Sequence, residues 1–269
     1  MTGEVGAEGK RDALRAHLGA NSPMVIAYSG GVDSAFLLAV ATESLGDQCL
    51  AVIADSPSLP RAALGGALAL ARAIRAKIEV VATSEMDDPN YANNPINRCY
   101  FCKSELFTKI EALAQQRGFR AIAYGENADD ARQGRPGRQA AAEFRVLAPL
   151  HEVGLTKSEI RALSRTMGLP TADAPAQPCL SSRIPHGTPV TTAALGMIER
   201  GEALVRSFGF RVFRVRHHVE ADRTRARVEI APNEMPGLAG VAEALHLGLR
   251  EVGYDDVLID PRGYRAPAA

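Results

Sequence analysis

Short apolar runs alternate with segments of helical period over the first 150 residues of the chain. Apolar runs long enough for one buried strand each lie at residues 24–28, 49–55, 77–82 and 120–124. Segments with apolar residues at helical spacing lie at residues 10–18, 35–44, 60–74 and 103–117. Strands that alternate with helices pair in parallel through right-handed crossovers. The pattern therefore predicts an α/β fold with a doubly wound parallel sheet, in which residues 146–150 form a fifth strand.

The pattern changes after a helix predicted to start at the capping box Thr156-Lys157-Ser158-Glu159. Residues 171–189 are rich in proline and have no periodicity, which is typical of a domain boundary. Beyond them, helices are predicted at 191–208 and 238–249, and strands at 211–216, 225–230 and 256–259. This order predicts a small α+β domain at residues 186–269, after a first domain at residues 1–185.

A glycine-containing turn joins the first predicted strand to the following helix. Its sequence is Ser29-Gly30-Gly31-Val32-Asp33-Ser34. Glycines let the backbone approach a ligand closely, and a helix start offers N–H groups and a partial positive charge to a phosphate. The turn has neither the Walker A pattern nor the GxGxxG dinucleotide pattern. It predicts a nucleotide phosphate site, and the alternative is an ordinary capped turn.

Further polar residues follow predicted strands at the edge of the sheet where open α/β sheets bind ligands. Asp55 follows the second strand, and Gly125, Asp129 and Asp130 follow the fourth. Magnesium bound to ATP phosphates needs only one or two protein carboxylates. We therefore expect Asp33, Asp129 and Asp130 to surround a Mg²⁺ site, unless Asp129 and Asp130 only cap a turn.

Composition excludes several classes of protein. The formal net charge of the 269 residues is zero, which argues against a protein that holds nucleic acid mainly by charge. The first residues have no apolar core of a secretory signal, and no run of eighteen apolar residues predicts a membrane span. We expect a cytoplasmic protein without nucleic-acid or membrane partners.

Three of the four cysteines lie in polar, irregular surroundings. Cys99 and Cys102 form a CxxC pair after a long loop, and Cys179 lies in the second irregular segment, whereas Cys49 lies in an apolar run. In a reducing compartment such a pair indicates metal binding or chemistry. Three thiolates fit a [4Fe–4S] cluster with one open iron, and His151 or His186 would complete a zinc site. Unpaired structural thiols are the third alternative, and Cys49 is expected to be buried.

Strand alternation places arginines together in the C-terminal domain. Arg214 and Arg216 fall on one face of one strand, and Arg225, Arg227 and Glu229 on one face of the next. Arginine forks suit phosphate or carboxylate ligands, and the alternative is a solvated outer face. His217 and His218 are interpreted as turn residues after the strand.

These motifs occur in the same order in one known family. Besides the loop at 29–34, they are GENADD at 125–130, Arg135-Pro136-Gly137, LTKSEIR at 155–161, PCLSSRIPHG at 178–187, FRVRHH at 213–218, ARVEI at 226–230 and Gly263-Tyr264-Arg265. The chain resembles the sulfur transferases of nickel-pincer nucleotide cofactor synthesis, the LarE family, within the PP-loop ATP pyrophosphatase superfamily. The resemblance covers nearly the whole chain, and the PCLSSR stretch is its most specific part.

The resemblance implies an enzyme that uses ATP and Mg²⁺ to adenylate the carboxylates of pyridinium-3,5-biscarboxylic acid mononucleotide and then replaces AMP by sulfur. It implies that Cys179 is the sulfur site. It also implies that Glu202, Arg214, Arg216 and Glu229 line the pocket for the substrate phosphate and a divalent cation. We accordingly expect Asp33 and Glu202 to be catalytic with Cys179, and Asp55, Gly125, Asp129 and Arg183 to bind the nucleotide.

One branch of the family has a single cysteine and sacrifices its sulfur. The additional Cys99 and Cys102 make this chain similar to the branch in which three cysteines hold a [4Fe–4S] cluster whose open iron carries sulfide. The resemblance also implies a homo-oligomer and a downstream nickel-inserting protein. The alternatives are a tRNA-thiolating or amide-forming PP-loop enzyme, and a nucleotide-sensing module with a structural zinc.

Overall fold

The computed structural model describes residues 6–130 and 136–264. The chain divides into two compact units, which interleave in sequence. The first comprises Met1–Glu85 and Asn97–Gln177, and the second comprises Met86–Ile96 and Pro178–Ala269. The chain therefore passes from the first unit to the second after Gln177, eight residues before the domain boundary that we predict at residue 185. Arg135 and Arg265, which belong to two of the family motifs, lie outside the described residues.

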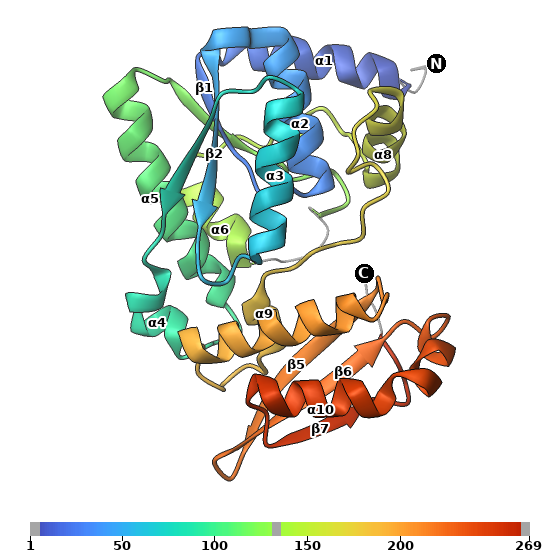
Figure 1. Cartoon of the computed structure of the whole chain (residues 1–269). Helices are drawn as coiled ribbons and strands as arrows, with labels where there is room; N and C mark the ends of the chain where they lie inside the picture. Colours follow the sequence, from blue (N-terminus) through green and yellow to red (C-terminus); the bar gives the residue numbers. More distant parts are fainter. Residues whose placement is uncertain (1–5, 131–135, 265–269) are drawn as a thin grey trace. The chain divides into compact units, whose positions relative to one another are not determined.

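The first unit contains a four-stranded parallel sheet (Figure 1). Its strands are β1 (Met24–Ala27), β2 (Cys49–Asp55), β3 (Ile78–Ala82) and β4 (Ala121–Tyr124), in the order β3-β2-β1-β4. Its helices are α1 (Ala7–Ala20), α2 (Val32–Leu45), α3 (Arg61–Ala73), α5 (Arg98–Arg117), α6 (Pro136–Glu143), α7 (Pro149–Glu152) and α8 (Lys157–Thr166). The strand order reverses at β1, and this confirms the predicted doubly wound α/β fold.

Helices cover both faces of this sheet, because alternate strand residues point to opposite sides. Met24 and Ile26 of β1 pack in the core formed with α1, α2, α3 and α8. Val25 and Ala27 pack in a second core formed with α5 and α6. The loop at the end of β1 is thus fixed from both sides.

Residues 146–150 do not form the predicted fifth strand. Only Leu147 pairs with the sheet: its N–H donates to Ile122 O at 2.8 Å, and its carbonyl accepts from Tyr124 N at 3.0 Å. Proline has no N–H for a ladder but suits the first turn of a helix. Pro149 therefore ends the pairing and starts α7, and Leu150 packs in the core as a helical residue.

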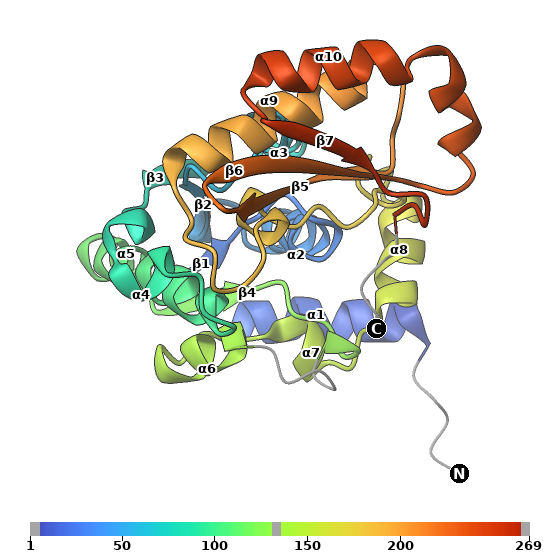
Figure 2. The same ribbon diagram turned by 90° about the horizontal axis from the view of Figure 1, so that it is seen from below.

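The second unit has an α+β arrangement on a three-stranded sheet of order β5-β6-β7 (Figure 2). Its elements are α4 (Pro89–Ala92), α9 (Thr192–Ser207), β5 (Phe213–Glu220), β6 (Arg223–Ile230), α10 (Ala242–Val252) and β7 (Asp256–Ile259). From α9 onward they follow the predicted order. The pairing of β5 with β6 is antiparallel and that of β6 with β7 is parallel. Helices α9 and α10 lie on one face of the sheet, which Figure 2 shows from below.

Strand β5 is longer than predicted, and His217 and His218 lie inside it rather than in a turn. All eight residues of β5 pair with β6 through a tight hairpin at Ala221 and Asp222, which have φ of 47° and 60°. Two successive residues with positive φ are typical of the turn that matches the twist of a two-residue hairpin. No helix in the described part of the chain is long and apolar enough to cross a membrane.

Candidate active site

The loop after β1 is closed by its own side chains. Ser34 Oγ donates to Gly31 O at 3.1 Å, accepts from Ser29 N at 3.3 Å and lies 3.0 Å from Ser29 Oγ. Gly30 has φ of 76°, and a Cβ there would lie 2.7 Å from the Cβ of Ala67. Only glycine fits that position without strain. The first turn of α2 then directs N–H groups without intrahelical partners at the space in front of the loop.

The end of β4 packs directly against this loop. A Cβ on Gly125 would lie 2.6 Å from Ser34 N and 2.8 Å from Ser34 Cα. Gly125 thus serves close backbone packing, which brings the residues after β4 beside the phosphate loop. Gly31 differs, because within 4 Å a Cβ there would meet, of the described part of the chain, only Ser29 Oγ, at 3.6 Å. The space in front of Gly31 is open to a ligand.

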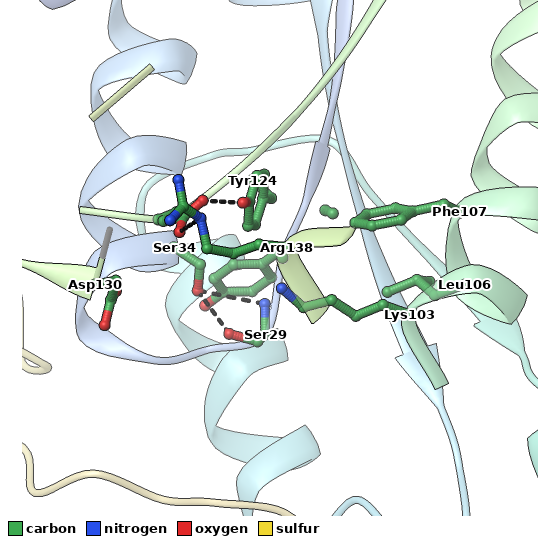
Figure 3. Close-up of a pocket in the computed structure, with 12 residues that line it drawn as sticks. Ser29, Ser34, Lys103, Leu106, Phe107, Tyr124, Asp130 and Arg138 are labelled. Atoms are coloured by element: carbon green, nitrogen blue, oxygen red, sulfur yellow. Dashed lines mark hydrogen bonds and ion pairs between the residues drawn. The ribbon is translucent and has the colours of Figure 1, made fainter. Parts of the chain in front are cut away.

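A pocket of about 210 Å³ opens beside the loop, between the ends of β1 and β4 and helices α5 and α6 (Figure 3). Ser29 and Ser34 contribute hydroxyls to its lining, and Lys103 and Arg138 contribute two cationic side chains. Figure 3 shows Lys103 extending into the pocket with its ammonium end directed toward Ser29 and Ser34. The ammonium also lies 4.5 Å from the centroid of the Tyr124 ring. Hydroxyls and cations at a helix start form a site for an anionic phosphate group.

The other wall of the pocket is a hydrogen-bonded network around Glu126. Tyr124 Oη donates to Glu126, and Arg138 Nε lies 2.7 Å from the same carboxylate. Burial, followed by the bond to Glu126, raises the pKa of Tyr124 well above its ordinary value. The phenol therefore keeps its proton and holds Glu126, which in turn orients Arg138.

The carboxylates predicted for Mg²⁺ meet a lysine of α8. Lys157 Nζ lies 2.7 Å from Asp33 Oδ2, and Lys157 N donates to Asp129 Oδ2 at 2.8 Å. Asp33 Oδ1 is buried and has no hydrogen-bond partner within the described residues. Asn127 Oδ1 accepts from the N–H groups of Asp129 and Asp130, so Asn127 caps this turn, whereas Asp129 accepts from the first N–H of α8.

These oxygens fit a magnesium ion that is shared with phosphates. Within residues 6–130 and 136–264, no three His, Cys, Asp or Glu side chains are grouped to hold a metal ion by themselves. Magnesium at a nucleotide requires only one or two carboxylates, because phosphates and water complete its shell. Asp33 supplies an oxygen that has no hydrogen-bond partner among the described residues. Asp55, at the end of β2, instead accepts a hydrogen bond through Oδ1 from Arg61 Nη1 at 2.5 Å.

The cysteines are divided between the units. Cys49 is 3% exposed, and burial raises the pKa of its thiol to about 12, which confirms the expected buried position. Cys99 and Cys102 are the second and fifth residues of α5, and a spacing of three places both thiols on one side of the helix. Cys179 belongs to the second unit and is half-buried.

A buried ion pair anchors the segment that carries Cys179. Arg183 Nε and Nη2 donate to Glu202 at 2.8 and 3.2 Å, and both side chains are less than a tenth exposed. Arg183 Nη1 also donates to the carbonyl oxygens of Pro178 and Cys179, at 2.7 and 3.1 Å. Glu202 Oε1 further accepts from Val215 N at 3.3 Å. Arg183 and Glu202 thus connect the Cys179 backbone to β5.

The arginines of β5 do not form a solvated outer face. Arg214 is 6% exposed and Glu229 is 5% exposed, while Arg216 Nε donates to Glu229 at 2.7 Å. Arg214 stacks on the Tyr264 ring at 4.9 Å and donates to its hydroxyl at 3.1 Å. Among the described residues Arg214 forms no ion pair with a carboxylate. Burial first, and the charges of Arg183 and Arg216 after it, lower the pKa of Arg214.

The segment 86–96 holds the part of the chain that follows Cys179. Tyr91 Oη lies 2.7 Å from Ser181 Oγ, and both side chains are buried. Asn94, which is fully buried, donates through Nδ2 to the carbonyl oxygens of Pro185 and Thr188, each at 2.8 Å. Sequence analysis identifies this segment only as the long loop before Cys99, because its partners lie some 90 residues away in sequence. The asparagine-rich composition is the one signal of such side-chain to backbone bonding.

Sequence reasoning also missed Lys103, Arg138 and Lys157 as site residues. Lys103 follows the CxxC pair, Arg138 follows Pro136-Gly137, and Lys157 belongs to the capping box. Sequence analysis uses only the motif beside each residue and assigns none of the three side chains to the phosphate site. Their convergence on the loop depends on how α5, α6 and α8 pack.

No family model matches the chain. It is 40% identical over 264 residues to an uncharacterized protein of Synechocystis, with 96% of both chains covered. It is 28% identical over 258 residues to the pyridinium-3,5-bisthiocarboxylic acid mononucleotide synthase of Lactiplantibacillus plantarum, covering 96% of this chain and 92% of that one. It is 24% identical over 246 residues to an uncharacterized protein of Methanocaldococcus jannaschii, covering 91% and 92%. The chain belongs to the family of these proteins, the LarE family, which includes the Lactiplantibacillus synthase.

Proposed function

We propose that this protein is an ATP-dependent sulfur transferase of nickel-pincer cofactor biosynthesis. It adenylates the carboxylates of pyridinium-3,5-biscarboxylic acid mononucleotide and replaces AMP by sulfur. The name of the Lactiplantibacillus relative describes the corresponding bisthiocarboxylic product. The observation that carries the proposal is the buried Arg214, a cation without a carboxylate partner in the described residues, in the unit that also carries Cys179.

The first unit supplies the activation step. The N–H groups at the start of α2, with Ser29 and Ser34, bind the phosphates of ATP, and Lys103 and Arg138 neutralise their charge. Asp33 and Asp129 or Asp130 would hold Mg²⁺, which would supply further positive charge to the leaving pyrophosphate. A substrate carboxylate oxygen attacks the α-phosphorus, the bond to the β-phosphate oxygen breaks, and an acyl-adenylate forms.

The second unit supplies recognition of the substrate. A buried arginine without an opposite charge is costly, and an anionic ligand removes that cost. Arg214, with Arg216 and Arg183 near it, therefore binds the substrate phosphate. Glu202 and Glu229 accept from Arg183 and Arg216 in this structure and so orient these arginines. The cation-binding role that the resemblance implies for Glu202 and Glu229 stays a prediction.

Cys179 is proposed as the residue through which sulfur reaches the activated carboxyl. Hydrosulfide that attacks the carbonyl carbon expels AMP with its oxygen and leaves a thiocarboxylate. Attack by the Cys179 thiolate instead leaves a thioester, whose Cβ–Sγ bond must then break by elimination, with dehydroalanine left in the chain. The backbone around the cysteine is fixed by Arg183, and the residues after it by Tyr91 and Asn94. Fixing the segment orients the sulfur for attack.

Cys99 and Cys102 are proposed to join Cys179 on a [4Fe–4S] cluster. The donor chemistry suits a cluster, because two thiols share one side of the start of α5 and a helix N-terminus favours thiolates, although the described residues do not group the three thiols around one point. The segment 86–96, whose Asn94 holds the Cys179 segment, leads within a few residues to Cys99. When bound, the cluster would supply a sulfur source that spares the Cys179 side chain.

Iron analysis tests the cluster. Anaerobic reconstitution should give about four irons per chain. Replacement of Cys99, Cys102 or Cys179 by Ala should remove the iron, whereas the buried Cys49→Ala should retain it. A protein that stays iron-free anaerobically, and that loses one H₂S from Cys179 after a single turnover, would show the sacrificial mechanism instead.

Steady-state kinetics test the substrate site. Arg214→Met should raise the KM for the mononucleotide about ten- to hundredfold, the range expected for a lost charge-assisted hydrogen bond, and leave the KM for ATP nearly unchanged. Arg225→Met is the control, because Arg225 pairs with Asp256 and Glu220 on the exposed part of the same sheet. Equal KM values in wild type and Arg214→Met would refute the substrate site.

The resemblance supports three further proposals. The enzyme acts in the cytoplasm, assembles as a homo-oligomer and delivers its product to a nickel-inserting protein. Size-exclusion chromatography with light scattering measures the oligomeric state directly.

A further inference from the structure

Lys157 has a fixed backbone and a mobile charged end. It is the first residue of α8, whose start is held by a complete capping box between Thr156 and Glu159. Glu159 also accepts from Lys10 Nζ at 2.8 and 3.0 Å, which ties the helix start to α1. The Lys157 N–H is occupied by Asp129. The ammonium, by contrast, ends a four-carbon chain that is 37% exposed and can change rotamer without moving the helix.

The ammonium lies where the Asp33 carboxylate needs a positive charge. It contacts one oxygen of Asp33 at 2.7 Å, and the other oxygen is buried without a partner in the described residues. The Asp33 side chain is only 16% exposed, so water compensates its charge poorly. Lys157 therefore neutralises a carboxylate that would otherwise lie uncompensated behind the phosphate loop.

A divalent cation on Asp33 would weaken the contact of this lysine with the same carboxylate. A magnesium ion on the same carboxylate would place two positive charges within a few ångströms of the ammonium, and like charges at that distance repel strongly. The bound ion also brings the phosphates of ATP, which are the nearest new anions at the loop. An ammonium displaced from Asp33 thus has a partner within reach of its flexible stem.

We propose that Lys157 takes the place of the divalent cation beside Asp33 in the nucleotide-free protein and transfers to the phosphates when Mg²⁺ and ATP bind. This inference rests on the proposed use of ATP. It gives Lys157 two successive roles. The lysine neutralises Asp33 before nucleotide binds, and it adds a positive charge beside the pyrophosphate once nucleotide is bound. The exchange also links ion binding to nucleotide binding, because the ion alone must displace the lysine.

Two binding measurements test the exchange without relying on turnover. Mn²⁺ is titrated into the nucleotide-free protein by electron paramagnetic resonance, and α,β-methylene-ATP, which cannot be cleaved at the reacting bond, is titrated in the presence of Mg²⁺ by calorimetry. Lys157→Met should bind Mn²⁺ at least about fivefold more tightly than wild type, the lower end of typical coupling between sites. It should bind the ATP analogue about ten- to hundredfold more weakly, as expected for a lost charge-assisted contact. Lys157→Arg, which keeps the charge, should resemble wild type in Mn²⁺ binding.

Two controls separate this exchange from a structural role. Lys10→Met removes another lysine–carboxylate pair at the start of α8 and should leave both affinities unchanged. Asp33→Asn should abolish the Mn²⁺ gain of Lys157→Met in the double variant. If Lys157→Met binds Mn²⁺ no more tightly, or binds the analogue as well as wild type, the exchange is overturned and the proposed function stands. If wild type binds no ATP analogue, the proposed function itself fails.

Discussion

Gly30 and Gly31 are neighbours in the phosphate loop, but the chain needs them for different physical reasons. Gly30 has positive φ and packs its α-carbon where a Cβ would overlap Ala67. Gly31 has φ of −74°, which any residue adopts, and faces open space. The first glycine thus serves the fold, and the second keeps the approach to the helix start clear.

A side chain introduced at each position in turn should separate these roles. Gly30→Ala should lower the free energy of unfolding by at least about 1–3 kcal/mol, the usual cost of a strained backbone position. Gly31→Val should unfold at nearly the wild-type urea concentration but release no pyrophosphate, because its side chain occupies the phosphate approach. Urea titration and a pyrophosphate assay measure both effects. Wild-type pyrophosphate release by Gly31→Val would contradict the assignment of the loop.

Strand β5 shows how one element divides its side chains between a core and a site. Arg214 and Arg216 lie on the face away from the helices, while Val215 and His217 point into the core. His217 is 4% exposed, and its ring lies 5.6 Å from that of Tyr254. Burial, and after it the charge of His218, lower the pKa of His217.

This burial predicts a pH-dependent stability of the second unit. The unfolded chain binds a proton at His217 near the ordinary pKa of about 6.5, whereas the folded protein does not. Stability should therefore be full above that pH and fall as the pH drops below it, by at most about 1.4 kcal/mol per pH unit for one proton. Thermal unfolding between pH 5 and 8 measures the slope. His217→Phe should flatten it, and the exposed His246→Gln should not; an unchanged slope in His217→Phe would exclude this histidine as the cause.

Elements with a strong period were predicted from the sequence, and elements set by distant partners were not. The local apolar pattern was enough to predict β1, β2, β3 and β4, because the strands of a parallel sheet are typically apolar runs covered on both faces. The end of β5 was missed because His217, His218 and Glu220 look polar, although pairing with β6 extends the strand through them. Leu147 makes two ladder bonds, but Pro149 ends a strand that periodicity alone predicts.

At the scale of the whole molecule, the interleaving of the two units could not be predicted. The segment 86–96 has no apolar period, and its bonds to Ser181, Pro185 and Thr188 join residues about 90 positions apart. The phosphate loop was predictable because its residues are contiguous. Lys103, Arg138 and Lys157 were not, because they reach the loop only through the packing of three helices.

The central claim is that a carboxylate activated at the loop of the first unit receives sulfur through Cys179 of the second. The most direct test is mass spectrometry of small molecules and protein after anaerobic incubation of the reconstituted wild type and Cys179→Ala with ATP, Mg²⁺, sulfide and pyridinium-3,5-biscarboxylic acid mononucleotide. The account predicts that wild type forms AMP, pyrophosphate and a substrate in which sulfur has replaced carboxylate oxygen. Cys179→Ala should still release pyrophosphate but form no sulfur-containing product. Sulfur-containing product from Cys179→Ala, or ATP cleavage by wild type without sulfur entering the substrate, would contradict the account.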